Sequence, residues 1–360
     1  MARNNKKSTG FNCEHIGYSR CPICCIIPPH MLENVAVNGN PEQRSWAFQT
    51  LNVSAQLRGR RNVVGSVSFA PSPGVKRRTI YDAKNSENLP GILVRGEGDP
   101  PSSDPAVNEA YDYAGATYDL FHEIFDRNSI DDKGLRLDST VHYGVKYENA
   151  FWNGDQMVYG DGDGELFQRF TKSIDVIAHE LTHGVTQYEA GLQYYAEPGA
   201  LNESFSDVFG ALVKQKSKNQ TVQQADWVIG EGLLAPNVKG VGIRSLKAPG
   251  TAYDDPVLGK DPQPAFMKDK YTGTEDNAGV HINSGIPNHA FYLAAMEIGG
   301  YAWEKAGKIW YITLRDRLRA NASFKAAATA TIKVASELYG NDSKEQKAIQ
   351  NAWQKVGVIK

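Results

Sequence analysis

Hydrophobic positions in the second half of the chain recur at the spacing of α-helices. From about residue 168 onward this period predicts a succession of helices, at 174–191, 198–216, 282–299, 302–318, 323–340 and 343–357. Between about 75 and 159, short alternating or β-branched runs predict strands instead, at 77–83, 91–97, 139–147 and 156–162. One predicted helix, 104–128, interrupts these strands. A β-rich half followed by a helical half predicts an α+β fold with a cleft between two lobes.

Residues 1–67, here called the leader, differ from the rest of the chain. Residues 1–27 follow no clear period, and two short helices are predicted in 28–57. The Arg-, Gly-, Ser- and Pro-rich stretch 58–74 is typical of an exposed linker that proteases cut. The basic N-terminus lacks the apolar core of a secretory signal. The prediction is therefore a cytoplasmic protein with no Sec signal, and release by a non-classical route stays open.

Charge is distributed unevenly between the leader and the body of the chain. The 360 residues carry a net charge of −2 and include 22% charged residues, which argues against a nucleic-acid binder. No apolar run approaches the roughly 20 residues that a membrane span needs. The leader nevertheless holds eight Lys or Arg and three acids, a charge of +5, so that the body carries −7. This indicates two parts that attract each other, although a basic disordered tail fits the charge equally well.

The sequence IDVIAHELTHGVTQYEAG places His179, Glu180 and His183 in one predicted helix. Residues i and i+4 project from the same helix face, so both imidazoles can reach one Zn²⁺ at roughly 2.0–2.1 Å. Glu180 lies beside them and can approach a water molecule at the metal without ligating the metal. The alternative is a buried helix with two hydrogen-bonded histidines.

A catalytic zinc ion needs a third protein ligand and one open position. In the next predicted helix, the segment ALNESFSD carries Glu203 and Asp207 four residues apart on one face. We assign Glu203 as the third ligand and Asp207 as the partner of the second ring nitrogen of His179. Asn202 can serve His183 in the same way. The acids are embedded among apolar residues, which argues against the alternative that they only solvate a helix face.

A further segment with histidines, TEDNAGVHINSGIPNHAF, follows at 274–291. His281, with Asp276 five residues before it, can stabilise the oxyanion that forms when water attacks a carbonyl near the metal. His289 competes for this role, but it falls in the following helix and is more typical of a structural or surface histidine.

Three segments resemble the thermolysin-type zinc metallopeptidases. Residues 176–210 and 276–294 are similar to the zinc-site and oxyanion segments of that family, and 149–164 is similar to its substrate-edge strand. The resemblance covers 75–360 and is strongest to protealysin-like members. These share a short prosegment with a Pro-Pro motif, here Pro28-Pro29, and lack a signal peptide.

This resemblance implies a two-lobed catalytic domain preceded by a small helical prosegment. The implied divisions are the prosegment at 1–67, a β-rich lobe at 68–188 that ends in the zinc-site helix, and a helical lobe at 189–360. The implied activity is that of a zinc-dependent neutral endopeptidase made as an inactive precursor. It would cut peptide bonds on the N-terminal side of bulky apolar residues.

The resemblance also implies a role for each matching residue. The catalytic group comprises the zinc ligands His179, His183 and Glu203, the general base Glu180, the intermediate-stabilising Tyr195 and His281, and Asp276, which orients His281. The substrate-binding group comprises Asn149, Ala150 and Arg244, which hold the peptide backbone, and Phe170, Val176, Ile229, Leu233 and Ile243, which line an apolar specificity pocket.

One difference from the family concerns calcium. Asp175, Asp226 and Glu231 match three acids of a calcium pair near the family's active site, whereas Lys214 and Val228 occupy two further positions. Because a lysine cannot ligate Ca²⁺, we expect its ammonium to replace the metal and to pair with Asp226 or Glu231. Alternatively, Lys214 points into solvent and one calcium ion remains.

The leader is then interpreted as a prosegment that docks on the acidic body and inhibits the enzyme. Self-cleavage is expected before Val67 or Phe69, with a trypsin-like cut after Arg61 as the alternative. All four cysteines lie in the leader, and three interpretations stay open. They are free thiols, a thiolate that binds the catalytic zinc in the precursor, or a separate metal site built from Cys13, Cys21, Cys24 and His15.

A different class of function is a zinc-stabilised binding module without catalysis, whose cleft the leader closes permanently. Glu180, Tyr195 and His281 argue against it, because a scaffold does not need them. The expected partners are protein or peptide substrates and the prosegment itself, with no nucleic acid and no membrane. The chain is expected to be a monomer.

Overall fold

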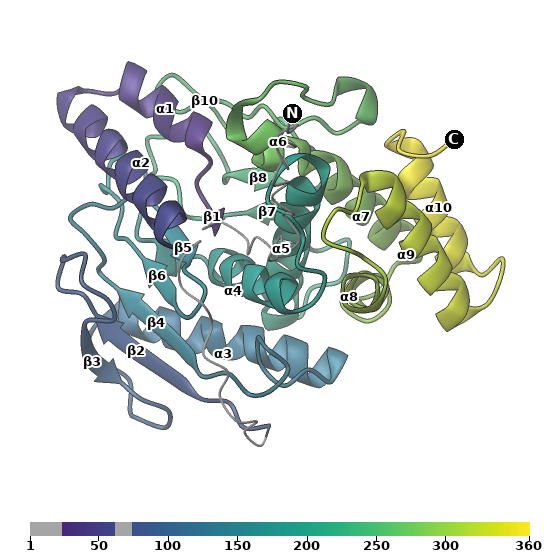
Figure 1. The fold of residues 1–360 in the computed structure, drawn as a ribbon, viewed down its shortest axis with the longest axis horizontal. Coiled ribbons are helices and arrows are strands. Elements are labelled where there is room, and N and C mark those ends of the chain that lie inside the picture. The colour runs from purple at the N-terminus through teal and green to yellow at the C-terminus, as the bar shows by residue number, and fades with distance from the viewer. Residues whose placement is uncertain (1–23, 62–73) are drawn as a thin grey trace, which may run out of the picture.

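A sheet backed by a long helix forms one side of the molecule, and a group of helices forms the other (Figure 1). The structure, a computed structural model, describes residues 24–61 and 74–360. The predicted α+β fold with a β-rich part followed by a helical part is confirmed. None of the helices in the described ranges is long and apolar enough to cross a membrane.

The main sheet has six strands in the order β1-β5-β6-β4-β2-β3. The pairs β2–β4 and β4–β6 are parallel and the other neighbours are antiparallel. The strands are β1 (Cys24–Cys25), β2 (Arg78–Asp82), β3 (Ile92–Arg95), β4 (Leu137–Val141), β5 (Ala150–Trp152) and β6 (Met157–Tyr159). Two small hairpins follow, namely β7 (Val228–Ile229) with β8 (Arg244–Ser245) and β9 (Asp254–Asp255) with β10 (Gly259–Lys260).

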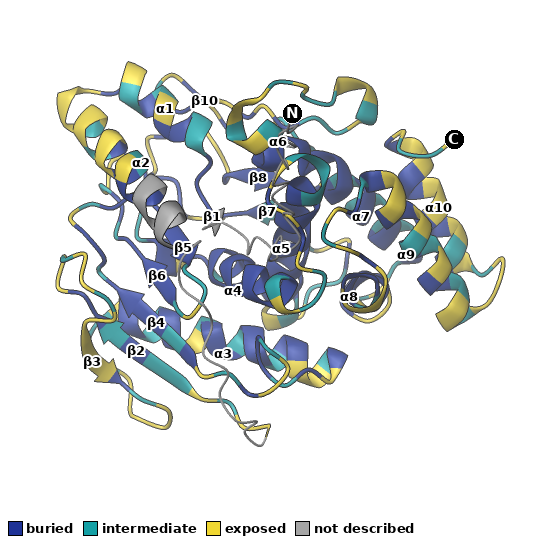
Figure 2. Cartoon of the chain, viewed as in Figure 1, coloured by how far each residue is buried: buried dark blue, intermediate teal, exposed yellow. Residues whose placement is uncertain are grey.

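Helices dominate after residue 170, as the apolar period predicts. They are the 3₁₀ turns η1 (Phe170–Lys172) and η2 (Met267–Asp269), and the helices α4 (Ile174–Tyr188), α5 (Ala196–Ser217), α6 (Glu275–Asn283), α7 (Gly285–Ile298), α8 (Ala306–Asp316), α9 (Phe324–Tyr339) and α10 (Lys344–Lys355). Helices α4 and α5 cross the middle of the molecule and are mostly buried (Figure 2). Gly210 lets their backbones approach, because a Cβ there would lie only 2.7 Å from the Asp175 carbonyl oxygen.

Helix α3 (Pro105–Phe125) packs against β2 and β4 on one face of the sheet. Its start follows from the sequence: Asp104 accepts a hydrogen bond from the Ala106 N–H at 2.8 Å, and Pro105 occupies the first turn. The predicted strand 139–147 is displaced, since β4 ends at Val141. His142 adopts a left-handed conformation with φ 54°, which stops the strand.

The leader contributes two helices and one strand to the described structure. Helices α1 (Pro29–Asn38) and α2 (Pro41–Arg61) match the two predicted helices. Met31, Leu32 and Val35 of α1 are buried, whereas its outer side is exposed (Figure 2). The predicted leader end at residue 67 and the predicted cuts before Val67 and Phe69 lie outside the described residues. So do Cys13, His15 and Cys21 of the hypothetical second metal site, whereas its fourth member, Cys24, lies in β1.

Candidate metal and catalytic site

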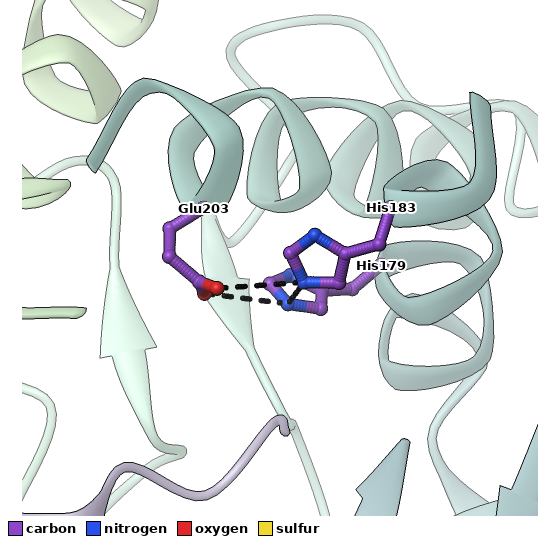
Figure 3. Close-up of side chains that lie close together, drawn as sticks. All are labelled: His179, His183 and Glu203. Carbon is purple, nitrogen blue, oxygen red and sulfur yellow. Dashed lines mark hydrogen bonds and ion pairs between the residues drawn. The ribbon is translucent and has the colours of Figure 1, made fainter. Parts of the chain in front are cut away.

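Two neighbouring helices place three ligand-type side chains around one point (Figure 3). His179 and His183 come from the same face of α4, and Glu203 comes from α5; we call these three residues the metal cluster. The two Nε2 atoms lie 2.9 Å apart, and the Glu203 carboxylate lies 3.5 Å from His179 Nε2 and 3.4 Å from His183 Nε2. All the ligand atoms lie within 4.8 Å of one another, and all three side chains are buried.

The hydrogen bonds around the metal cluster select one tautomer for a neutral imidazole at His179 and at His183. His179 Nδ1 donates to Asp207 Oδ1 and His183 Nδ1 donates to Asn202 Oδ1, both at 2.8 Å. Each neutral imidazole therefore carries its lone pair on Nε2, toward its neighbour and the carboxylate. Burial lowers the pKa of His183 to about 3, which favours the same neutral form. Two imidazole lone pairs and one carboxylate fit a tetrahedral zinc ion with an open position.

Asp207 connects the metal cluster to Arg244 and Asn288. It accepts from Arg244 through two hydrogen bonds of 2.8 Å and from Asn288 Nδ2 at 2.8 Å, in addition to His179. Burial alone would raise the pKa of Asp207, but Arg244 and His179 outweigh burial and hold it well below its usual range. The carboxylate thus stays charged and orients His179. Sequence reasoning missed Asn288, which carries no motif of its own.

Glu180 lies on α4 directly after the first ligand and is fully buried. Its Oε2 accepts the backbone N–H of Trp152 at 3.1 Å. This contact ties the carboxylate to strand β5 of the main sheet. Gly184 lets the same helix pack closely against Ile130 and Trp152, because a Cβ there would lie 2.5 Å from Ile130 Cγ2 and 3.2 Å from Trp152 Cε2.

The prediction that Tyr195 faces the site is wrong by one position. The Tyr195 side chain is 60% exposed, whereas the buried Tyr194 donates its hydroxyl to Glu203 Oε1 and lies 3.0 Å from His281 Nε2. The backbone at Tyr195 is extended, with φ −154° and ψ 139°, so adjacent side chains point in opposite directions. Because the two tyrosines are adjacent, the sequence alone does not show which of them faces the site.

His281 and Asp276 meet as the sequence predicts. Asp276 Oδ1 lies 2.6 Å from His281 Nδ1, and Asp276 Oδ2 accepts the His281 backbone N–H at 2.8 Å. Burial by itself lowers the pKa of His281, but Asp276 and Glu203 raise it to about 9. The competing His289 lies apart from this group, with Nδ1 bonded to the Leu246 carbonyl oxygen at 3.2 Å.

The predicted backbone-binding residues all contact the leader, and sequence reasoning did not identify which leader residues make these contacts. Asn149 bonds both backbone groups of Ile27, at 3.0 and 3.3 Å, and the Ala150 carbonyl oxygen accepts the Ile26 N–H at 3.3 Å. Arg244 Nη1 donates to the Ile26 carbonyl oxygen at 3.0 Å. The predicted pocket residues are all buried and belong to the same apolar cluster as Ile26: Phe170, Val176, Ile229, Leu233 and Ile243.

Lys214 is buried among acids near the start of α4. Its ammonium lies 2.9 Å from Asp175 Oδ2, 2.7 Å from Asp226 Oδ1 and 2.5 Å from the Val228 carbonyl oxygen, while Glu231 is 4.0 Å away. The prediction that Lys214 pairs with Asp226 agrees with this geometry, and the alternative of a solvent-facing lysine does not. Burial by itself lowers the pKa of Lys214, but Asp175 and Asp226 outweigh burial and raise it.

Comparison with known proteins supports the resemblance inferred from the motifs. The family models described as "Thermolysin metallopeptidase, catalytic domain" and "Thermolysin metallopeptidase, alpha-helical domain" match residues 74–187 and 190–358. An extracellular metalloprotease of Pectobacterium carotovorum is 53% identical over 346 residues, which cover 94% of this chain and 97% of that protein. The thermolysin of Alicyclobacillus acidocaldarius is 42% identical over 288 residues, and the match covers 77% of this chain and 50% of that protein.

A solved structure extends the similarity into the leader. The precursor of protealysin, a metalloproteinase from Serratia proteamaculans, matches with a TM-score of 0.87 and 55% sequence identity. The match covers 93% of this chain and 100% of that one. The predicted resemblance to protealysin and the presence of a prosegment are thereby confirmed.

The prediction of a cytoplasmic protein is wrong. The relative from Pectobacterium carotovorum bears the name of an extracellular metalloprotease, which points to an extracellular protein. The missing apolar core near the N-terminus misled the sequence interpretation, because export does not depend on one kind of signal alone. The chain belongs to the thermolysin family and is a zinc metalloendopeptidase made as a precursor.

Proposed function

We propose that this endopeptidase uses Glu180 as its general base and the metal cluster as the holder of its zinc ion. The convergence of three buried ligand atoms on one point carries the proposal. The hydrogen bonds of His179 and His183 to Asp207 and Asn202 support it, since they keep both imidazoles in the ligating tautomer.

The surrounding side chains suit the hydrolysis of a peptide bond. When bound, the zinc ion supplies a Lewis acid for the attack of water on the substrate carbonyl. Glu180 takes a proton from the attacking water and passes it to the leaving nitrogen. Protonated His281, held by Asp276, and the Tyr194 hydroxyl donate hydrogen bonds to the oxygen that becomes negative.

We propose that Asn149, Ala150 and Arg244 bind substrate backbone in an extended pose. Each of them contacts leader backbone through the same polar atoms that a substrate would use. The buried apolar residues Phe170, Val176, Ile229, Leu233 and Ile243 would receive the side chain that follows the cut. Such a pocket favours a bulky apolar residue there.

The leader would inhibit the precursor by occupying this cleft. We propose the divisions 1–67 for the prosegment, 68–188 for the β-rich lobe and 189–360 for the helical lobe. We further propose that the chain acts as a monomer. The Lys214 ammonium would replace the metal of the family's double calcium site, which its contacts with Asp175 and Asp226 support.

The direct test is hydrolysis of a casein-type substrate with and without a zinc chelator, before and after removal of the leader. We expect cleavage after leader removal, its loss on chelation, and its return when Zn²⁺ is added. A non-catalytic binding module would show no cleavage under any of these conditions. Cleavage that persisted after complete zinc removal, confirmed by elemental analysis, would refute the zinc mechanism.

The corrected tyrosine assignment gives a matched pair of variants. Tyr194→Phe removes a hydroxyl that touches Glu203 and His281, and we expect kcat to fall by about a hundredfold. Tyr195→Phe alters an exposed side chain, and kcat should stay within about twofold of the wild type. The measurement is steady-state hydrolysis of a peptide by leader-free enzyme. The opposite order of effects would restore Tyr195 to the site.

A further inference from the structure

Four consecutive leader residues, 24–27, bond through their backbone to β5 and to Asn149 just before it. Strand β1 pairs antiparallel with β5, with Cys24 opposite Trp152 and Cys25 opposite Phe151. The contact continues beyond the strand, because the Ile26 and Ile27 N–H groups donate to the Ala150 carbonyl oxygen and to Asn149 Oδ1. Strand addition of this kind fixes the register of a bound peptide through main-chain hydrogen bonds.

One leader carbonyl lies beside the metal cluster. The Cys25 carbonyl oxygen is 3.2 Å from His281 Nε2, and that same nitrogen is 3.0 Å from the Tyr194 hydroxyl and 3.6 Å from Glu203 Oε1. The next carbonyl, of Ile26, points to Arg244 at 3.0 Å. Of the described leader residues, Cys25 therefore supplies the carbonyl that faces the proposed oxyanion donors.

The side chain after this carbonyl suits the specificity pocket. Ile26 is fully buried and, like the five proposed pocket residues, belongs to the main hydrophobic core of the protein. Cys25 packs in a separate apolar cluster, with residues such as Tyr147 and Phe151. The peptide bond that joins Cys25 to Ile26 thus precedes a bulky, β-branched apolar residue.

We propose, on the basis of the function proposed above, that the leader binds as a substrate and that the enzyme hydrolyses its own Cys25–Ile26 bond. Water adds its oxygen to the carbonyl carbon of Cys25, and the bond from that carbon to the Ile26 nitrogen breaks. Glu180 carries one proton of the water to this nitrogen, and the second proton follows to the same nitrogen when the new carboxyl group ionises. The products are a carboxylate at Cys25 and an ammonium at Ile26.

The cut leaves the rest of the leader attached to the body. Beyond Ile26, the two hydrogen bonds between Ile27 and Asn149 remain, and Asn34 Nδ2 still donates to the Leu258 carbonyl oxygen at 3.0 Å. The buried face of α1 also stays in place. The cleaved leader is therefore a bound product that keeps the cleft closed until α1 and α2 leave.

The test follows the full-length chain, loaded with zinc, over time. Intact-mass measurement and N-terminal sequencing, including any released peptides, should reveal a chain end that begins Ile26-Ile27-Pro28. Glu180→Ala should show no such end. Ile26→Asp places a charge in an apolar pocket and should lower the fraction cut at this bond by about tenfold or more. Ile26→Leu should retain the cut.

Two further measurements separate register from folding. Val37→Asp changes a side chain of α1 that is 70% exposed and should be cut as the wild type is. In the uncleaved Glu180→Ala chain, amide hydrogen exchange should be slow at Ile26 and Ile27, because their N–H groups are bonded to Ala150 and Asn149. Ile26→Asp in that background should lose the protection.

The outcomes distinguish this inference from the function on which it rests. If the zinc-loaded enzyme cleaves an external peptide while Cys25–Ile26 stays intact in every product, the inference is overturned and the proposed function stands. Rapid exchange at Ile26 and Ile27 would overturn the register itself. If neither the external peptide nor the leader is cut, the proposed function fails as well.

Discussion

Replacing Glu180 by alanine is expected to lower peptide turnover by about a thousandfold or more while the enzyme keeps its zinc. The reason is that the residues of α4 have separate roles: His179 and His183, with Glu203, can hold the ion without Glu180. Glu180 instead accepts a hydrogen bond from the backbone N–H of Trp152 on β5. The measurements are kcat with leader-free enzyme and zinc content by elemental analysis.

A control separates lost base chemistry from lost structure. Glu189 follows α4 and pairs with Arg127 away from the metal cluster, so Glu189→Gln should affect stability rather than the pH dependence or size of kcat. Zinc retained by Glu180→Ala together with an unchanged fold would assign the loss to proton transfer. A variant that kept even a tenth of wild-type turnover would remove Glu180 from this role.

Replacing Lys214 by methionine is expected to destabilise the enzyme by about 3 kcal/mol or more of unfolding free energy. The substitution removes the cation but keeps most of the side-chain volume, which leaves the fully buried Asp175 and the partly buried Asp226 without their cationic partner. Breaking a buried ion pair from one side is costly because the remaining charge stays desolvated. Urea unfolding in a Glu180→Ala background, where self-digestion is absent, provides the measurement.

Neighbouring lysines and added calcium sharpen this test. Lys216→Met on the same helix removes a partly exposed pair with Glu123 and should cost less than about 1 kcal/mol. If Lys214 replaces a metal ion, Ca²⁺ should leave the wild type unchanged and partly restore Lys214→Met, because the acids and the Val228 carbonyl offer oxygen ligands. A wild-type enzyme stabilised by Ca²⁺ at this site would contradict the replacement.

Local sequence pattern was sufficient for the metal cluster and for most of the fold. The i, i+4 spacing of His179 and His183 only produces a site on a helix, and the apolar period of 174–191 predicts that helix. The acids of α5 could be identified as site residues because burying a charge among apolar residues costs free energy unless the charge has a partner. Strand limits were less predictable, since the left-handed residue His142 ends β4 early.

Contacts between distant segments could not be predicted from local pattern. Ile26 and Ile27 touch Ala150, Asn149 and Arg244, which lie more than a hundred residues away in the sequence. No periodicity reports such a pairing. Tyr194 and Tyr195 were indistinguishable for a related reason: only the direction of the backbone before α5 decides which ring turns inward.

The pairing of β1 with β5 has a consequence for the kind of polypeptide that this protease can attack. When the leader leaves, β5 becomes an unpaired edge strand of the sheet. Its backbone groups can pair only with a polypeptide that is already in an extended conformation. Compact domains, with their own strands and helices intact, do not present such a chain. The substrates of the enzyme should thus be loops, chain termini and damaged or newly made proteins. Whether a segment is unfolded should matter more for its cleavage than its sequence does.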